Sequence, residues 1–261
     1  MTEDTFDITG EVALVTGSSR GIGRAITERF ADMGVDVVVS SRDQDAVDAV
    51  AEDINDSAAA GRAIGIECDI RDWDAIAALV EATEAELGAI DVLVNNAGAS
   101  FEAPLEELSQ NAWQTIVDIN LNGTFNCSRV VGNRMIENGG GTIVNLSSVA
   151  ARDGAPQMTH YAASKAGMNN LTRTLGYEWA SYDIRVNGIM PGLVLTEGLE
   201  SQRSVSADDI DTDEVDRQIG LPDEIARVVQ FLASPGAQYI QGETIVVEGV
   251  PRIPHTEHHD V

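Results

Sequence analysis

A tyrosine and a lysine near the middle of the chain could carry out acid–base chemistry together. Tyr161 and Lys165 are four positions apart, so on a helix they would share one face. A free phenol has a pKa near 10, and a neighbouring ammonium group favours the phenolate and lowers that pKa. Such a tyrosine could give a proton to a carbonyl oxygen or take one from an alcohol. Lys165 is also the single lysine among the 16 Lys and Arg residues, which favours a chemical role for it.

A serine upstream could complete this arrangement. Ser148 precedes Tyr161 by 13 residues and could supply a second hydrogen bond to the same oxygen. Plainer interpretations exist, because Y-x-x-x-K spacing is common on exposed helix faces, a serine can cap a strand, and Asn120 could stabilise a helix kink. The joint occurrence favours a catalytic site made of Asn120, Ser148, Tyr161 and Lys165.

A glycine-rich turn near the start of the chain indicates a phosphate-binding site. Glycines at 17, 21 and 23 suit a tight turn, close approach of the backbone to a pyrophosphate, and close packing of a helix on a sheet. The helix that follows would offer free N–H groups to phosphates. The spacing is G-x-x-x-G-x-G and not the generic G-x-G-x-x-G, so the strand–turn–helix context supports the inference. We expect a dinucleotide to contact Gly17, Ser19, Arg20, Gly21, Ile22 and Gly23.

The elements that position these residues alternate between strands and helices. Seven short apolar runs predict strands buried on both faces, at 11–16, 35–40, 62–69, 91–96, 141–147, 183–189 and 243–248. Helical periodicity occupies 21–33, 43–57, 72–87, 109–137, 160–180 and 222–233. This alternation predicts an α/β fold, a single-domain Rossmann-type doubly wound parallel sheet of about seven strands with helices on both faces. We expect one domain over 1–261, in which 193–221 has no strand and forms a substrate lid and 250–261 is an irregular tail.

Composition and charge exclude several classes of partner. The formal net charge is −27, which argues against binding to nucleic acid or to an anionic membrane surface. No secretory signal or membrane-spanning run is visible, and two distant cysteines, Cys68 and Cys127, fit reduced thiols in the cytoplasm. Abundant carboxylates with almost no lysine are typical of a halophilic protein, because the Debye length falls to about 3 Å at 1 M salt. An ordinary acidic protein is the alternative.

Several motifs resemble those of the short-chain dehydrogenase/reductase family, in the same order and with similar spacing. They are Thr16 to Gly23, Asn95-Asn96-Ala97-Gly98, Asn120, Ser148, Tyr161-Ala162-Ala163-Ser164-Lys165 and Pro191-Gly192-Leu193-Val194-Leu195-Thr196. The resemblance implies hydride transfer between a nicotinamide cofactor and a ketone or secondary alcohol. It also implies that Lys165 holds the nicotinamide ribose and that Asn120 holds a water linking Lys165 to solvent.

The end of the second strand bears on the choice of cofactor. NAD-binding sites usually carry Asp or Glu there, whereas this chain has Ser41 followed by Arg42. A hydroxyl and a guanidinium suit a 2′-phosphate, and Arg20 resembles the basic residue of relatives that use NADP. We therefore expect NADP(H) to be preferred, with NAD(H) possible if Asp43 holds the ribose and both arginines are solvated. The resemblance adds further cofactor contacts at Asp69, Ile70, Asn96, Pro191, Val194 and Thr196.

The substrate is less constrained than the reaction. Motif wording and length most resemble 3-oxoacyl thioester reductases, although Tyr177 stands where a basic carrier-docking residue is common. The alternatives are a sugar 1-dehydrogenase and a non-catalytic NADP-sensing protein. Arg152 could meet an anionic group of the substrate or lie free on the surface.

No metal is expected, including at the histidines of the tail. Relatives of this length suggest a homotetramer formed through the helices at 109–137 and 160–180, where Trp179 and Tyr182 fit an interface or a core equally well.

Overall fold

Seven parallel strands form the central sheet within the part of the chain that the computed structural model describes, residues 6–8, 11–203 and 205–250. Their spatial order is β3-β2-β1-β4-β5-β6-β9, so the strand order reverses between β1 and β4. The strands are β1 (Val12–Thr16), β2 (Asp36–Ser41), β3 (Ala63–Glu67), β4 (Val92–Asn95), β5 (Gly141–Leu146), β6 (Ile184–Pro191) and β9 (Thr244–Val247). The predicted doubly wound sheet is confirmed, and its reversal point is where such folds bind ligands.

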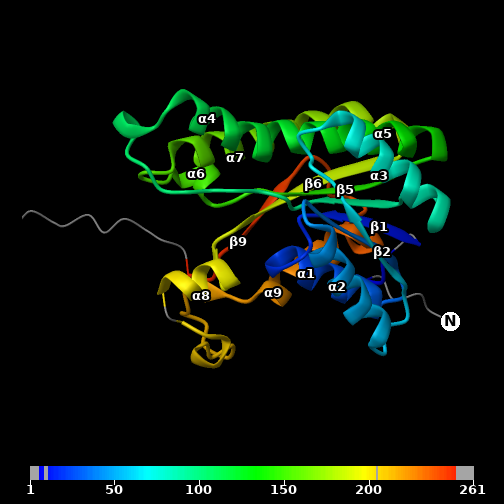
Figure 1. Cartoon of the computed structure of the whole chain (residues 1–261), viewed down its shortest axis with the longest axis horizontal. Coiled ribbons are helices and arrows are strands. Elements are labelled where there is room, and N and C mark those ends of the chain that lie inside the picture. The colour runs from blue at the N-terminus through cyan, green and yellow to red at the C-terminus, as the bar shows by residue number, and fades with distance from the viewer. Residues whose placement is uncertain (1–5, 9–10, 204, 251–261) are drawn as a thin grey trace, which may run out of the picture.

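Helices cover both faces of the sheet, which explains why its strands are apolar on both sides. The α-helices are α1 (Gly21–Asp32), α2 (Gln44–Asp56), α3 (Trp73–Glu86), α4 (Gln110–Val117), α5 (Gly123–Asn138), α6 (Ala150–Asp153), α7 (Thr159–Trp179), α8 (Glu197–Arg203) and α9 (Pro222–Ala233). Short 3-10 turns are η1 (Leu105–Glu107), η3 (Ala180–Tyr182), η4 (Ala207–Asp209) and η5 (Pro235–Ala237). Figure 1 shows α3, α5 and α7 on one side of the sheet and α1, α2 and α9 on the other.

Each face has its own hydrophobic core. On one face Ile26 and Phe30 of α1 pack with α2, α9 and the strands between them. On the other face Val131 of α5 packs with α3, α7 and the opposite side of the same strands. Trp179 belongs to this second core. Its indole ring lies directly against Gly132 of α5, where a β-carbon would be only 2.5 Å from the Cη2 atom of the ring. Its aromatic ring therefore supports the core of the subunit.

The long helix expected at 109–137 is interrupted. Between α4 and α5 the backbone forms a π-helical turn, η2 (Asp118–Asn122). Such turns often occur at functional sites, and this one contains Asn120. Sequence periodicity does not reveal one extra residue in a turn, although a helix kink at Asn120 was one of the interpretations considered from the sequence.

The segment 193–221 also differs from expectation. We predicted no strand there, yet β7 (Leu193–Val194) pairs in parallel with β8 (Ile219–Gly220) in a separate two-stranded sheet. Strands this short give no detectable alternation in the sequence. Of the irregular tail predicted at 250–261, only Val250 lies within the described residues. None of the helices within residues 6–8, 11–203 and 205–250 has the length and apolarity needed to cross a bilayer.

Candidate functional site

The glycine-rich turn between β1 and α1 is shaped by close contacts that exclude side chains. Gly17 and Gly21 have φ of +64° and +57°, which disfavours any residue with a β-carbon. A β-carbon at Gly17 would lie 2.7 Å from Ala97 Cα, and one at Gly23 would lie 2.5 Å from Asn96 Nδ2. Asn96 in turn donates from Nδ2 to the backbone oxygen of Gly17 at 2.8 Å. The turn is therefore a backbone cradle held by the segment after β4.

The N-terminus of α1 has no side-chain cap, in contrast to those of α2, α3 and α4. Asp43, Asp72 and Ser109 each accept a backbone N–H at the start of α2, α3 and α4, whereas Arg20 makes no such bond at the start of α1. The first turn of α1 thus keeps N–H groups available for an anion, as a pyrophosphate site requires. Ser19 and Ile22 of the same turn are half-buried, and Arg20 is exposed.

Segments from distant parts of the chain meet around this turn. A β-carbon at Gly21 would lie 3.3 Å from Thr196 Cγ2, which places the residue before α8 against the glycine turn. A β-carbon at Gly98 would lie 3.2 Å from Asn120 Oδ1 and 3.5 Å from Lys165 Nζ. The carboxyl ends of β1, β4 and β6, the π-helical turn and the start of α7 therefore form one continuous site.

Lys165 is buried at the centre of this site. Its Nζ atom donates to the backbone oxygen of Leu146 at 2.7 Å and lies 5.7 Å from the centre of the Tyr161 ring. Burial lowers the pKa of Lys165 to about 8. The geometry thus brings the amine and the phenol together, as their spacing on α7 predicts.

The pKa of Tyr161 differs from expectation. We predicted that the ammonium group and a bound nicotinamide ring together would lower the pKa of the phenol. In the chain by itself burial raises that pKa, and a hydrogen bond with Ser148 opposes the rise only in part. The reason is that desolvation disfavours the phenolate more than the surroundings stabilise it. Tyr161 is therefore a protonated phenol at neutral pH in the chain by itself.

The two adjacent serines after β5 point to different places. Ser147 is buried and donates from Oγ to the backbone oxygen of Lys165 at 3.1 Å. Ser148 is half-buried, faces Tyr161, and accepts the N–H of Ala150 at 3.2 Å. The hydroxyl beside the phenol is therefore that of Ser148, at the position that the 13-residue spacing selects.

Asn120 is held by several hydrogen bonds. Its Oδ1 atom accepts the N–H of Ala99 at 2.8 Å, and its Nδ2 donates to the Ala99 oxygen and to Ser164 Oγ, both at 3.0 Å. Ser164 donates onward to the backbone oxygen of Tyr161 at 2.7 Å. The side chain of Asn120 thus fixes the segment after β4 to the start of α7, and its water-holding role stays a prediction.

The ends of β2 and β3 lie side by side and carry the residues expected to select the cofactor. The Asp43 side chain accepts the Ala46 N–H at 3.2 Å and so caps α2. Ser41 and Arg42 precede it, half-buried and exposed respectively. Asp69 is paired with Arg71, which lowers the pKa of the Asp69 carboxyl, with a smaller contribution from Arg42.

The remaining expected cofactor contacts lie on the same edge of the sheet. Ile70 is buried, and its backbone oxygen accepts from Asn126 Nδ2 at 3.2 Å. Pro191 ends β6 and accepts the Val149 N–H at 3.0 Å, next to Ser148. Val194 is buried in β7. Apart from Tyr161 and Lys165 on α7, the residues expected to touch the dinucleotide lie at the carboxyl end of a strand or in the segment that follows it.

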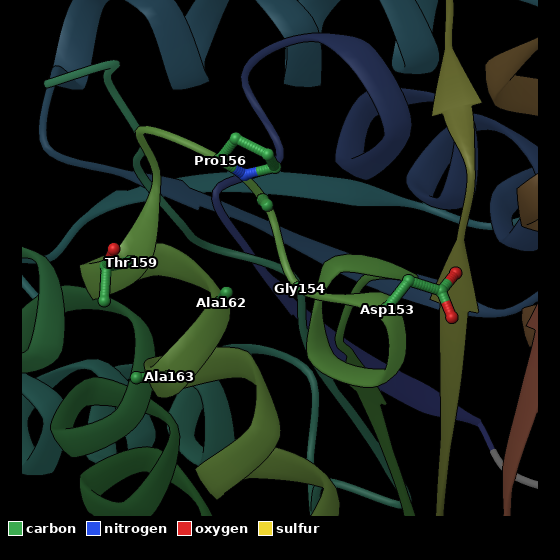
Figure 2. A pocket seen from close by; sticks show the side chains of 7 residues that line it. Asp153, Gly154, Pro156, Thr159, Ala162 and Ala163 are labelled. Atoms are coloured by element: carbon green, nitrogen blue, oxygen red, sulfur yellow. The ribbon is translucent and has the colours of Figure 1, made fainter. Parts of the chain in front are cut away.

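Arg152 is less available than its sequence position suggested. It donates to Asp153 at 2.6 Å and to Glu248 at 3.0 Å. Next to it an open groove of about 480 Å³ runs between α6 and the start of α7 (Figure 2). Asp153, Gly154, Pro156, Thr159, Ala162 and Ala163 line this groove together with Ala155. These α7 residues flank Tyr161 in sequence but occupy other faces of the helix, so the groove is separate from the phenol.

Two further residues beside the site were not singled out as functional by the sequence. His160 is completely buried, and its ring packs against that of Phe101 with centroids 4.3 Å apart and the ring planes tilted by 57°. Ser164 orients Asn120, as described above. The only signal was their spacing, since residues 160 and 164 share a face of α7.

The histidines at 255, 258 and 259 lie outside the described residues, and within those residues no group of three or more His, Cys, Asp or Glu is placed to hold a metal ion.

Comparison with known proteins finds a matching family and similar sequences. Residues 11–206 match the family model described as short chain dehydrogenase. The chain is 39% identical over 245 residues to the D-threitol dehydrogenase of Mycolicibacterium smegmatis, covering 94% of each chain. It is 37% identical over 244 residues to the 3-oxoacyl-[acyl-carrier-protein] reductase of Synechocystis, covering 93% of this chain and 97% of that one.

Solved structures are similar as well. A 7 alpha-hydroxysteroid dehydrogenase, complexed with NADH and 7-oxo glycochenodeoxycholic acid, superposes with a TM-score of 0.86. It is 33% identical in sequence, and the alignment covers 95% of this chain and 97% of that chain.

Proposed function

This chain belongs to the short-chain dehydrogenase family, and on that premise we propose that it is an NADP(H)-preferring enzyme that reduces a ketone to a secondary alcohol or catalyses the reverse reaction. Its activity as an oxidoreductase on alcohols and ketones follows from the family. The observation that supports the proposed site most strongly is the convergence of Tyr161, Ser148 and Lys165 beside the glycine turn.

The side chains would act on the carbonyl oxygen of the substrate. Tyr161 would donate its phenolic proton to that oxygen, and Ser148 would donate a second hydrogen bond that stabilises the developing charge. A raised phenol pKa suits this direction, because ketone reduction needs the protonated form. Lys165 would bind the nicotinamide ribose, and Asn120 would hold a water that links Lys165 to solvent. When bound, the nicotinamide supplies or accepts the hydride.

The described residues fit a dinucleotide along the edge of the sheet. The backbone cradle of Gly17, Gly21 and Gly23 and the uncapped start of α1 suit a pyrophosphate. The remaining contacts that we propose are Ser19, Arg20, Ile22, Ser41, Arg42, Asp69, Ile70, Asn96, Tyr161, Lys165, Pro191, Val194 and Thr196.

Preference for the 2′-phosphate rests on the end of β2. Asp43 is engaged as the cap of α2, so its carboxylate is less available for a ribose hydroxyl. Ser41 and Arg42 would then meet the phosphate, and Arg20 would add charge from the glycine turn. Replacing Ser41 by Asp and Arg42 by Ala together should reverse the ratio of kcat/KM for NADPH and NADH, whereas an unchanged ratio would contradict the assignment. Arg173→Ala, on the exposed side of α7, is the matched control.

Two classes of substrate remain candidates. A 3-oxoacyl thioester is favoured by motif wording and by the similar Synechocystis reductase. A neutral sugar or polyol is favoured by a specific observation, because Arg152 is neutralised by Asp153 and Glu248 and so offers little to an anionic carrier. The test is NADPH oxidation with a panel of 3-oxoacyl thioesters, simple ketones and ketoses, and NADP reduction with polyols and sugars. Wild-type protein that turns over no member of the panel, with either nicotinamide, would contradict the proposed function.

The remaining expectations extend the same proposal. We propose that 193–221, including β7, α8 and β8, closes over the substrate, and that the protein works in the cytoplasm, where its two buried free thiols would stay reduced. Exposed Leu105, Trp113 and Phe125 near α4 and α5 suit contacts in a homotetramer.

The net charge of −27 supports adaptation to concentrated salt. The melting temperature and the activity should rise as KCl increases towards molar concentrations. Best behaviour in dilute buffer would contradict this adaptation.

A further inference from the structure

His160 is a buried polar side chain for which the proposed mechanism has no use. It lies in the first turn of α7, directly before Tyr161, and none of its surface is exposed. Both ring nitrogens, Nδ1 and Nε2, are buried without a hydrogen-bond partner. A desolvated donor and acceptor left unpaired destabilise the fold, so such a pair in a native site calls for a partner that the functional state provides.

Among the described residues, the groups around the imidazole form no hydrogen bond with it. Ser164 shares a helix face with His160, but its hydroxyl already donates to the Tyr161 backbone oxygen and accepts from Asn120. The nearest ring is that of Phe101, at 4.3 Å between centroids and tilted by 57°, and a phenyl ring offers no acceptor of ordinary strength. Burial lowers the pKa of His160, so at neutral pH the imidazole carries one donor and one acceptor nitrogen.

The ring that covers His160 lies at the surface of the molecule. Phe101 is 39% exposed, so its ring closes the imidazole off from water while remaining at the surface itself. Its segment follows β4 and is tied to the start of α7 by the Ala103 N–H, which donates to the backbone oxygen of Gln157 at 2.8 Å. Gln157 has φ of +64°, an unfavourable conformation for a residue with a β-carbon, and strain of this kind is typical of functional sites.

This pair borders the place where the substrate must lie. Ala99, two residues before Phe101, is bound to Asn120, and Gly98 adjoins Lys165. A substrate whose carbonyl meets Tyr161 and Ser148 would therefore extend past the segment after β4 on one side.

We propose that His160 and Phe101 form a hydroxyl-binding subsite, in which the substrate displaces the Phe101 ring and pairs a hydroxyl group with the imidazole of His160. A hydroxyl can accept from the protonated ring nitrogen or donate to the other one, and two hydroxyls can satisfy both nitrogens, which an unsubstituted acyl chain cannot do. This proposal rests on the proposed function and narrows its substrate to polyhydroxylated ketones and polyols.

The test compares two ketones of four carbons each, erythrulose, which carries three hydroxyl groups, and 2-butanone, which carries none, with NADPH as the reductant. Wild-type protein should have the higher kcat/KM for erythrulose. His160→Leu keeps the approximate volume but removes both nitrogens, and should lower kcat/KM for erythrulose about tenfold while changing that for 2-butanone less than about threefold. His160→Gln, which retains a donor and an acceptor, should restore much of the preference. Met168→Leu, buried on the same helix, is the control and should leave the ratio unchanged.

A second variant keeps the test decisive if His160→Leu fails to fold. Phe101→Ala removes a half-exposed ring, should fold, and should lower the KM for erythrulose but not for 2-butanone, because no ring has to be displaced. Equal changes for the two ketones in these variants, or no change, would overturn the subsite. Wild-type protein that reduces neither ketone, and nothing else in the substrate panel, would instead overturn the proposed function itself.

Discussion

At the proposed cofactor end of the site the backbone forms the surface, whereas at the proposed catalytic end a few buried side chains do. Gly17, Gly21 and Gly23 leave no room for β-carbons, and their N–H groups and close contacts form the cradle. Around Tyr161, by contrast, the geometry depends on hydrogen bonds from Lys165 to Leu146 and from Asn120 to Ala99 and Ser164. Substitutions should therefore impair the two ends in different ways. At the glycine turn an added side chain crowds the backbone, whereas around Tyr161 a substitution removes a single functional group.

The largest effect should come from removing one oxygen at the catalytic end. Tyr161→Phe should reduce turnover by on the order of 10³-fold or more, because the proton donor is lost while the packing is kept. The dissociation constant for NADPH, measured by fluorescence titration, should stay within about threefold of wild type. Tyr177→Phe, an exposed position on the same helix, is the control and should change neither quantity. Substantial residual turnover by Tyr161→Phe would remove the proton-donor role.

At the glycine turn one added methyl group should be enough to weaken the binding of NADPH. Gly23→Ala would place a β-carbon 2.5 Å from both Asn96 Nδ2 and the Gly17 backbone oxygen, so the turn must shift. We expect NADPH to bind at least about tenfold more weakly, because the N–H groups that face the phosphates move. Gly198→Ala is the matched control in α8, since its nearest contact would be at 3.9 Å. Unchanged NADPH affinity in Gly23→Ala would show that the cradle is not used.

A smaller and pH-dependent effect should come from the buried lysine. Burial lowers the pKa of Lys165 from 10.5 to about 8, so the unfolded chain binds more protons between these two values. The free energy of unfolding of the wild type, minus that of Lys165→Met, should therefore increase as pH rises from about 8 to 10.5, and the full cost of the buried charge is present below pH 8. The total change should be up to about 3 kcal/mol, at 1.36 kcal/mol per pKa unit.

Denaturant unfolding of both proteins across this range of pH, at constant ionic strength, measures the difference. Arg173→Met serves as the control for loss of an exposed cation and should show no such trend. A difference that is flat or falls with rising pH would show that Lys165 is not desolvated in the folded chain.

Sequence reasoning succeeded where the pattern is periodic or where backbone geometry demands glycine. The seven strands were visible as apolar runs, although the edge strands β3 and β9 are mostly half-buried, and the glycine turn followed from residue type and spacing. The π-helical turn at Asn120 and the short pair β7 and β8 were missed because they are set by contacts with remote segments. The raised pKa of Tyr161 could not be anticipated either, because the spacing of Tyr161 and Lys165 indicates their proximity but not how much water is excluded from them.

The proposed subsite illustrates the same limit. A histidine before Tyr161 was visible in the sequence, but its burial beneath Phe101 depends on a segment about sixty residues away. The sequence indicated no role for His160, and only the packed structure shows that both of its ring nitrogens lack hydrogen-bond partners.

The most direct test of the central claim is to follow the hydrogen that reaches the substrate. Wild-type protein should be incubated with NADPH deuterated at both C4 positions and with the ketone from the substrate panel that it reduces fastest, and the alcohol analysed by mass spectrometry. We predict one deuterium on the carbinol carbon, and no alcohol when Tyr161→Phe replaces the wild type. Alcohol without deuterium, or NADPH oxidised with no alcohol formed, would contradict hydride transfer at this site.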